Sequence, residues 1–319
     1  MTSTRSLVES ALLAGLAVVL FLSAEFLPFV GLAFSLLAPA PLVVLGLRHN
    51  GKMAVLGLLI ATTLIVLFLG PLSGLFFLLG FGVLGVSLGW LAKRCKSGAE
   101  VLLYGILVSL GSKLLLMTLA AKITGINPFQ LDAVEFQAMV DRIFSLYQSA
   151  GMSPESLAAV RQQFAQAIET IPMIFPAILT AASALDCYLS YTVSSFVLKR
   201  IGGQGLPALP PFSHWRFPKS LFGALIASMV FTIVGARGGE AWNIALRAGV
   251  NLRMLLNFLF LLQGLSLIWY LLKGRVGKAL AVAAIILVMF VPLLSTVAVM
   301  AGIADMWLDF RARYGRNDP

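Results

Sequence analysis

The sequence predicts an all-α integral membrane protein, a polytopic bundle of about eight to ten transmembrane helices with an amphipathic helical hairpin outside the membrane. Three observations lead to this fold class. Hydrophobic residues make up 60% of the 319 residues and charged residues only 11%, whereas soluble domains carry about 25% charged residues. The apolar residues form runs long enough to cross a bilayer. The basic residues lie mainly in the short turns between these runs.

The candidate spans follow from the lengths of these runs. A helix needs about 20 predominantly apolar residues to cross a hydrocarbon core about 30 Å thick. The first run is too long for a signal-peptide core and lacks a clear cleavage site, so we expect it to remain as a helix. In the short second run, Pro39 and Pro41 free backbone groups, which predicts a kink or an unwound stretch. The candidates are residues 7–27, 31–47, 53–69, 72–92, 101–121, 171–198, 220–236, 242–272 and 279–304.

The charges of the turns predict the orientation of the bundle. If the spans alternate in direction, the basic turns all lie on one face, which the positive-inside rule identifies as cytoplasmic. Arg5 places the N-terminus on the same side, and the opposite turns, at Pro28 and at Gly70-Pro71, carry no charge. The basic turns contain Arg48 and Lys52; Lys93, Arg94 and Lys96; Lys199, Arg200, Arg216 and Lys219; and Lys273, Arg275 and Lys278.

The C-terminal segment departs from this alternation, because strict alternation would leave Arg311, Arg313 and Arg316 outside. Pro292 lies near the middle of residues 279–310. We favour a short hairpin of two half-length helices that returns the arginine tail to the cytoplasm. The alternative is one long tilted helix with an external tail.

One long segment, residues 122–170, is polar and lies on the external side. Asn127-Pro128 and Ser153-Pro154 are both good helix starts, a capping side chain followed by proline. Apolar residues follow each start at helical spacing. We therefore expect an external helical hairpin with its turn near Gly151. It could be a lid, a partner-binding element, a helix pair on the membrane surface or a simple cover over helix ends.

The cytoplasmic loop at residues 201–217 is rich in proline and glycine, and it ends in Trp215 and Arg216. Proline makes such a segment extended and stiff. Aromatic and basic side chains are typical of the membrane interface. The loop is therefore either an interfacial anchor or a docking strip for a cytoplasmic partner, with Trp215 and Arg216 as the contact residues.

Ionisable residues inside spans are costly, and each is by default a functional-site hypothesis. Lys113 could extend outward to water, whereas the 242–272 span carries arginines and asparagines at four-residue spacing that cannot face lipid. They form either an internal network that holds helices together or a cavity that binds a small polar or anionic solute. The predicted substrate-binding residues are Arg247, Asn251, Arg253, Asn257, Asp186 and Glu25, with the two acids as partners of the arginines.

Several classes of function are excluded by absent motifs. The spans carry no HExxH, GxSxG or paired-acid protease signature, and the chain has neither a P-loop nor a GxGxxG motif. We therefore expect neither an enzyme nor an ATPase. Cys95 and Cys187 lack metal-binding spacing, and His49 and His214 are too few for a histidine metal site, so no metal or other cofactor is expected. The net charge of +10 resides in turns, which excludes a nucleic-acid partner.

Small residues on the first span suggest a docking face. Ala11 and Gly15 form a small-xxx-small pair, with Ala14 beside them, that lets another helix approach closely. The partner is either a helix of this chain or another membrane subunit.

Five stretches resemble the YybS-like family of bacterial predicted membrane proteins (domain of unknown function 2232). They are ESALLAGLA at 9–17, PAPLVVLGLRH at 39–49, PPFSHWRFP at 210–218, LLQGLSLIWY at 261–270 and GIADMWLDFR at 302–311. The resemblance covers nearly the whole chain. It implies a bacterial membrane protein and no particular chemistry. Taking it together with the basic turns and Arg5, we expect a multi-pass protein of the bacterial inner membrane, surrounded by the lipid bilayer, with a cytoplasmic N-terminus.

The first spans are also similar in pattern to the substrate-binding S-components of energy-coupling-factor transporters, which have six helices. This resemblance implies a six-span bundle at residues 1–200, including the hairpin at 122–170, followed by the Pro-rich loop and C-terminal helices at 201–319. It also implies that Ala11, Ala14 and Gly15 dock a coupling subunit. The first functional hypothesis is a solute-binding, transport-related component without its own ATPase. The alternative is a membrane scaffold or regulatory protein that binds a partner through its cytoplasmic loop.

Overall fold

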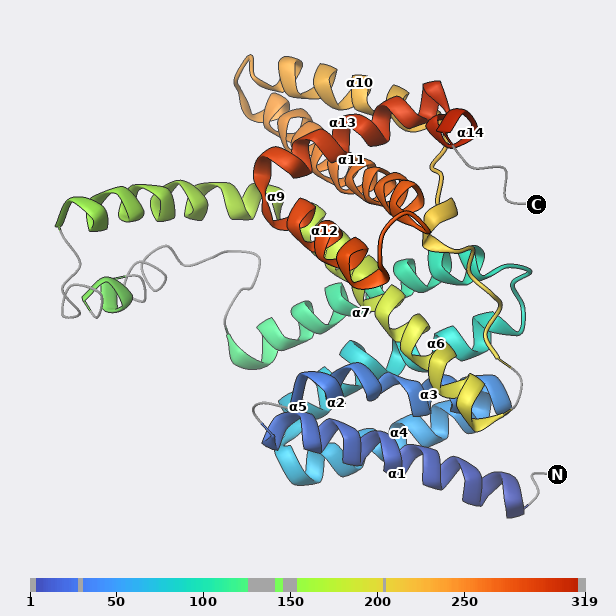
Figure 1. The fold of residues 1–319 in the computed structure, drawn as a ribbon. Coiled ribbons are helices and arrows are strands. Elements are labelled where there is room, and N and C mark those ends of the chain that lie inside the picture. The colour runs from blue at the N-terminus through green and yellow to red at the C-terminus, as the bar shows by residue number, and fades with distance from the viewer. Residues whose placement is uncertain (1–3, 28–30, 126–140, 146–153, 203–204, 315–319) are drawn as a thin grey trace. The chain divides into compact units, whose positions relative to one another are not determined.

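The computed structural model describes residues 4–27, 31–125, 141–145, 154–202 and 205–314 (Figure 1). Helices account for most of these residues, and the described part of the chain contains no β-strand, so the all-α prediction is confirmed. The chain divides into two compact units. Unit 1 is Met1–Met152 with Ala182–Leu209, and unit 2 is Ser153–Ala181 with Pro210–Pro319. The domain boundary expected at residue 200 stays a prediction.

The number of membrane-crossing helices is smaller than expected. Among the described residues, six helices are long and apolar enough to cross a membrane, or up to seven if one bent pair is a single span. The second candidate is split into α2 (Gly31–Leu37) and α3 (Pro39–Arg48), and α10 (Ser220–Gly235) has 16 residues. At 1.5 Å per residue, α10 is only about 24 Å long. The six are α1 (Thr4–Phe26), α4 (Gly51–Leu69), the span Pro71–Ala92, α7 (Gly98–Thr124), Thr170–Ile201 of α9 and Trp242–Leu272 of α11.

The second candidate is interrupted at a single residue, Ala38, whose backbone keeps helical dihedral angles, so the predicted kink or unwound stretch stays a prediction. Helix α2 ends at Leu37 and α3 begins at Pro39, where the missing N–H of a first-turn proline costs nothing. Every residue of α3 from Pro39 to Leu47 is buried. This short helix is therefore the centre of unit 1 rather than a lipid-facing span.

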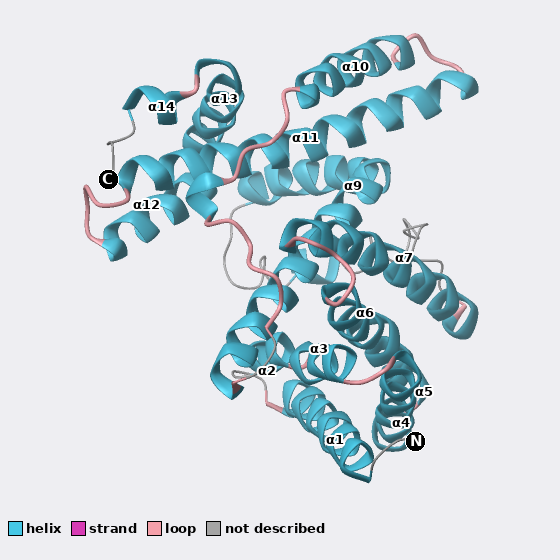
Figure 2. Ribbon diagram, turned by 90° about the vertical axis from the view of Figure 1, so that its right-hand side faces the viewer, coloured by secondary structure: helices cyan, strands magenta, loops and turns pink. Residues whose placement is uncertain are grey.

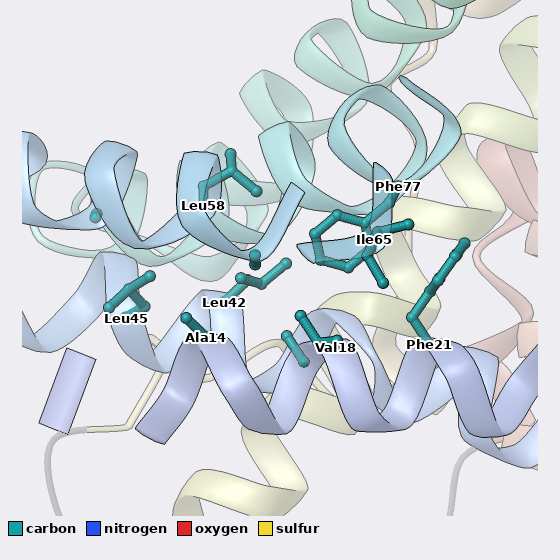
Figure 3. Packing of buried hydrophobic residues seen from close by; sticks show 11 residues of the cluster. Ala14, Val18, Phe21, Leu42, Leu45, Leu58, Ile65 and Phe77 are labelled. Carbon is teal, nitrogen blue, oxygen red and sulfur yellow. The ribbon is translucent and has the colours of Figure 1, made fainter. Parts of the chain in front are cut away.

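One hydrophobic cluster of unit 1 is formed by α1, α3, α4 and the π-helix η1 (Phe77–Gly82), which joins α5 (Pro71–Phe76) to α6 (Val83–Ala92). Figure 3 shows its buried side chains, among them Ala14, Leu42, Ile65 and Phe77. The rings of Phe21 and Phe77 meet edge to face, with centroids 5.2 Å apart. Glycine permits the close contact of α3 with α6, since a Cβ atom at Gly85 would lie 2.8 Å from the Cβ atom of Leu42.

Several basic turns lie at one end of unit 1, as alternation predicts. Arg48 at the end of α3 pairs with Glu9 on α1 at 2.8 Å, and Lys93 after α6 donates to the carbonyl oxygen of His49 at 2.6 Å. Asn50 caps the next helix by accepting a hydrogen bond from the backbone N–H of Met53 at 2.9 Å. The N-terminal part of α1, the α3–α4 turn and the α6–α7 turn therefore share one face.

The predicted external hairpin is only partly described. Residues 126–140 and 146–153, including the expected start at Asn127 and the turn at Gly151, lie outside the described residues. The start predicted at Pro154 is confirmed, because Pro154 is the first residue of α9 (Pro154–Ile201). The second helix of the expected hairpin and the sixth span belong to one helix, whose membrane-crossing part begins at Thr170. Helix α9 is continuous over 48 residues, with Pro172 and Pro176 inside it.

Unit 2 is organised around α11 (Glu240–Leu272), which packs against α10 and α13 (Pro292–Leu308). Figures 1 and 2 show α10 running beside α11. Glycines make both contacts close. A Cβ atom at Gly249 would lie 2.7 Å from the hydroxyl oxygen of Thr232 on α10, and one at Gly302 would lie 2.8 Å from the backbone nitrogen of Gly264. Backbone proximity at small residues is the usual way that membrane helices associate.

The C-terminal segment consists of two short helices, as favoured from the sequence. Helices α12 (Lys278–Phe290) and α13 are bent by 101° at a break at Val291. Their lengths of about 20 and 26 Å are each below the thickness of a hydrocarbon core. Pro292 occupies the first turn of α13, where it cannot continue the preceding helix. One long tilted helix is therefore excluded.

We predict that Gly302→Ala lowers the free energy of unfolding by about 2 kcal/mol, because the added methyl group overpacks the contact between α11 and α13. Thermal unfolding of the purified protein in mild detergent measures the change. Gly223→Ala is the matched control, since a Cβ atom there would meet nothing within 4 Å. The control should be neutral or stabilising by up to about 1 kcal/mol through helix propensity. Equal unfolding temperatures for the two variants would contradict this packing.

Candidate functional site

An ion pair lies inside the apolar helices of unit 1. The ammonium group of Lys113 on α7 is 2.6 Å from Oδ2 of Asp186 on α9. Lys113 also donates to the hydroxyl oxygen of Ser109 at 2.7 Å, and Ser109 donates to the same Asp186 oxygen at 3.4 Å. The side chains of Lys113 and Asp186 are 21% and 31% exposed. Because each residue belongs to a membrane-crossing helix, this pair is a candidate functional site.

Small residues bring the two helices together at this point. A Cβ atom at Gly105 would lie 2.7 Å from Sγ of Cys187, and Cys187 and Ser109 are fully buried. Gly105, Ser109 and Lys113 follow one another at four-residue spacing, which places them on one face of α7. Along this face of α7, in the direction away from Gly98, a glycine is followed by a hydroxyl side chain and then by a charged one.

The π-helix η1 contributes a further polar contact beside the pair. The hydroxyl of Ser112 on α7 donates to the backbone carbonyl oxygen of Leu79 in η1. A π-helix alters the regular backbone bonding and leaves carbonyl groups that need other donors, and such segments are frequent at functional sites. Ser112 is buried and adjacent to Lys113. The π-helix and the ion pair are thus joined through one turn of α7.

Helix α9 carries a line of buried serines on the side of Asp186. Ser183, Ser190 and Ser194 are each no more than 3% exposed. The Ser194 hydroxyl has no hydrogen-bond partner among the described residues. A buried polar group without a partner is unusual, so this stretch of α9 is more polar than packing alone requires.

The structure gives Asp186 a different partner from the one expected. We expected Asp186 to pair with the arginines of the 242–272 span and Lys113 to extend outward, whereas the two pair with each other within unit 1. A signal for this pairing was present. Along α7, Lys113 lies about 22 Å from the first residue of the helix, Gly98. Along α9, Asp186 lies the same distance from the last residue of the helix, Ile201. Antiparallel helices with equal offsets place their charges at equal depth.

Asn251, predicted to bind substrate, bonds to the backbone of α9 within unit 2. Its side-chain oxygen accepts from the backbone N–H of Ala177 at 2.8 Å, and its amide nitrogen donates to the carbonyl oxygens of Met173 and Arg247, both at 2.7 Å. Ala177 and Met173 are four residues apart and flank Pro176. Asn251 therefore replaces a helical hydrogen bond opened beside the proline, and both of its N–H groups are used.

The other predicted substrate-binding residues are not gathered within either unit. Arg247, Arg253 and Asn257 lie exposed on α11, and Glu25 lies exposed near the end of α1. Over residues 4–27, 31–125, 141–145, 154–202 and 205–314, the side chains of these four residues make no recorded hydrogen bond or ion pair. The solute site built from them stays a prediction.

The Pro-rich loop is bonded to its own chain by Arg311, which we had expected to belong to a C-terminal arginine tail. Arg311 on α14 (Phe310–Tyr314) is 4% exposed. It donates to the carbonyl oxygens of Ser213 at 2.5 Å and Trp215 at 3.0 Å, and to the hydroxyl of Ser266 at 3.1 Å. Its Nε lies 3.3 Å from Oδ2 of Asp305, an ion pair whose geometry is not that of a hydrogen bond. Burial lowers the pKa of Arg311, and Asp305 opposes this shift.

The two residues proposed to contact a cytoplasmic partner also bond within the chain. Arg216 pairs with Asp309 through two hydrogen bonds of 2.7 and 3.2 Å, which lower the pKa of the Asp309 carboxyl group. The Trp215 indole N–H donates to the carbonyl oxygen of Pro210 at 3.1 Å. The end of α13 and α14 therefore lie at the same end of unit 2 as the loop, as the predicted C-terminal hairpin requires.

The small residues of α1 are divided between two environments. Ala14 is 1% exposed and belongs to the core of unit 1, whereas Ala11 is exposed. A Cβ atom at Gly15 would meet nothing within 4 Å. The small-xxx-small pair of Ala11 and Gly15 is thus open, and Ala14 packs internally. No group of three potential metal-binding side chains occurs among the described residues.

Comparison with known proteins gives the family. Residues 15–306 match the family DUF2232, described as "Predicted membrane protein". The chain belongs to the DUF2232 family. It is 26% identical over 318 residues to "Uncharacterized protein YybS" of Bacillus subtilis (strain 168), which covers 98% of this chain and 99% of that protein. No solved structure matches. The resemblance to YybS-like DUF2232 proteins is therefore confirmed, and the similarity to S-components stays a prediction.

For this DUF2232 protein, we predict that Arg311→Met costs about 3–5 kcal/mol of stability, since it leaves a buried Asp305 carboxylate and three acceptors without their donor. Replacing Asp305 by Leu in the same chain should restore most of the loss. Arg313→Met is the control, because Arg313 is exposed and should change stability by less than about 0.5 kcal/mol. Thermal unfolding in detergent distinguishes them. An Arg311 variant as stable as the control would show that the loop is not held by this residue.

Proposed function

We propose that this protein is a solute-binding, transport-related component of the bacterial inner membrane, without catalytic or ATPase activity of its own. The observation that carries the proposal is the partly exposed Lys113–Asp186 pair inside two helices long and apolar enough to cross a membrane. Charged side chains within spans are costly, and they commonly mark the pathways of solutes and ions.

Stability alone does not account for the pair. Helices α7 and α9 already pack through Gly105 and Cys187, and replacing a buried ion pair by apolar residues of similar size is often neutral or stabilising. An ion pair that served only to hold two helices together would be expected to be buried, whereas these side chains are 21% and 31% exposed. Access of a solute to the pair supplies a reason for the exposure.

A second observation, made within unit 2 alone, is the exposed polar face of α11. Arg247, Arg253 and Asn257 are exposed on a helix of membrane-crossing length, and an arginine facing lipid at mid-depth is expensive. We propose that they line the path of a polar or anionic solute. The orientation in this proposal follows the basic turns, with the N-terminus, the Pro-rich loop and the C-terminal helix on the cytoplasmic side.

The scaffold alternative depends on the cytoplasmic loop. Trp215 and Arg216 both bond to other parts of the chain, so binding of a partner by these side chains would first have to break the contacts with Pro210 and Asp309. This cost favours the transport proposal over the scaffold.

Purification from native membranes in mild detergent tests the proposal. We expect a polar small molecule to be released on denaturation and identified by mass spectrometry. Its recovery should fall about tenfold or more in Arg253→Leu, because a lost charge contact of about 1.4 kcal/mol corresponds to tenfold in affinity. Arg313→Leu, an exposed arginine outside the spans, is the control and should retain the solute. Recovery of neither a solute nor a coupling subunit from the unmodified protein would refute the proposal.

Docking of a membrane subunit can be tested on α1. We predict that Ala11→Leu with Gly15→Leu leaves thermal stability unchanged but removes any co-purifying membrane subunit, because both positions are open. Ala14→Leu is the contrasting variant, and it should lower stability by about 1–3 kcal/mol through overpacking of the core. Retention of the subunit by the double variant would exclude this face as its docking site.

A further inference from the structure

The Lys113–Asp186 pair is neutral as a unit, which restricts what can open it. Inside apolar helices, an ion that loses its partner is strongly destabilised, because its charge is no longer compensated by water or by an opposite charge. An anion bound to Lys113 would leave Asp186 uncompensated, and a cation bound to Asp186 would leave Lys113 uncompensated. A ligand that carries both charges avoids either penalty.

The pair also has unused hydrogen-bonding capacity. An ammonium group has three donors, and the recorded partners of Lys113 are Ser109 and Asp186. Both recorded contacts of the Asp186 carboxylate are made by Oδ2, and Oδ1 has no recorded partner among the described residues. The two side chains are 21% and 31% exposed, so neither is fully enclosed by the described residues.

Ser109 can remain bonded while the pair exchanges partners. Its fully buried hydroxyl accepts from Lys113 and donates to Asp186. A hydroxyl group does both at once, so it can keep either charged group hydrogen-bonded when the direct contact between them opens.

We propose that the solute recognised at this site is a small zwitterion, whose carboxylate pairs with Lys113 and whose ammonium group pairs with Asp186. The inference rests on the proposed transport function and adds the class of substrate. Binding replaces one neutral ion pair by two, and no net charge enters the apolar region. The Lys113–Asp186 pair is then the resting state of an empty site.

The experiment measures ligand-induced shifts in the unfolding temperature of the full chain in detergent, since binding to the folded state stabilises it. The zwitterionic probes are alanine, β-alanine and γ-aminobutyrate, which differ in the separation of their charges. Acetate and ethylammonium are the singly charged probes. At least one zwitterion should raise the unfolding temperature, and neither singly charged probe should do so at the same concentration.

Substitutions at Lys113 and Asp186 test whether the zwitterion binds at this ion pair. Lys113→Met with Asp186→Leu removes both charges and should weaken zwitterion binding at least tenfold, while the exchanged pair Lys113→Asp with Asp186→Lys should retain binding within about tenfold. The control is Glu9→Leu with Arg48→Met, which removes an ion pair of 2.8 Å with 34% and 35% exposed side chains. This control should bind like the unmodified protein.

The possible outcomes separate this inference from the proposed function. Acetate or ethylammonium binding that depends on Lys113 and Asp186 would overturn the zwitterion and leave solute binding intact. Zwitterion binding that survives in the Met/Leu variant would overturn the assignment to this pair. If no probe binds and no solute co-purifies, both proposals fail.

Discussion

The hydrocarbon interior of a bilayer offers no hydrogen-bond partner, so the backbone N–H and C=O groups of these helices must find theirs within the protein. Much of the observed structure follows from that constraint. Pro176 opens the backbone of α9, and Asn251 supplies both the missing donor and the missing acceptor. The π-helix η1 alters the backbone bonding of its span, and Ser112 donates to the carbonyl of Leu79. In both places a side chain on a neighbouring helix repairs an irregular backbone, which also fixes the register of the two helices.

The same constraint explains why glycine is found where helices meet. Lipid tails provide little hydrophobic drive for helix association, so packing and backbone proximity provide it. Gly85 on α6, Gly105 on α7 and Gly302 on α13 each lie where a Cβ atom would come within 3.0 Å of a neighbouring helix. The short helices α3, α10 and α13 depend on such contacts more than the long ones, because they do not cross a hydrocarbon core by themselves.

Local signals in the sequence were sufficient for much of the fold. Pro39, Pro154 and Pro292 each begin a helix, because proline restricts the backbone in a way that no distant contact reverses. Span counting gave too many spans because an apolar run in the sequence does not show whether its helix is broken or too short to cross a bilayer, as with α3 and α10. The continuity of α9 was missed because its polar and apolar halves differ in composition while sharing one backbone. Arg311 was expected to belong to a C-terminal arginine tail, because the sequence does not show that an arginine has hydrogen-bond partners far away along the chain.

The candidate site was harder to predict than the fold, because it depends on which charges pair. Two ion pairs in the structure illustrate the difference. Arg311 and Asp305 have side chains only 3% and 1% exposed, and the guanidinium group makes three further hydrogen bonds. Breaking this buried pair would leave the Asp305 carboxylate and the other acceptors of Arg311 without their donor at the same time. The side chains of Lys113 and Asp186 are partly exposed and have hydrogen-bonding positions without a recorded partner among the described residues. The Ser109 hydroxyl can hydrogen-bond to either group. The first arrangement resists exchange and suits an anchor, whereas the second permits exchange and suits a site that alternates between an internal partner and a ligand.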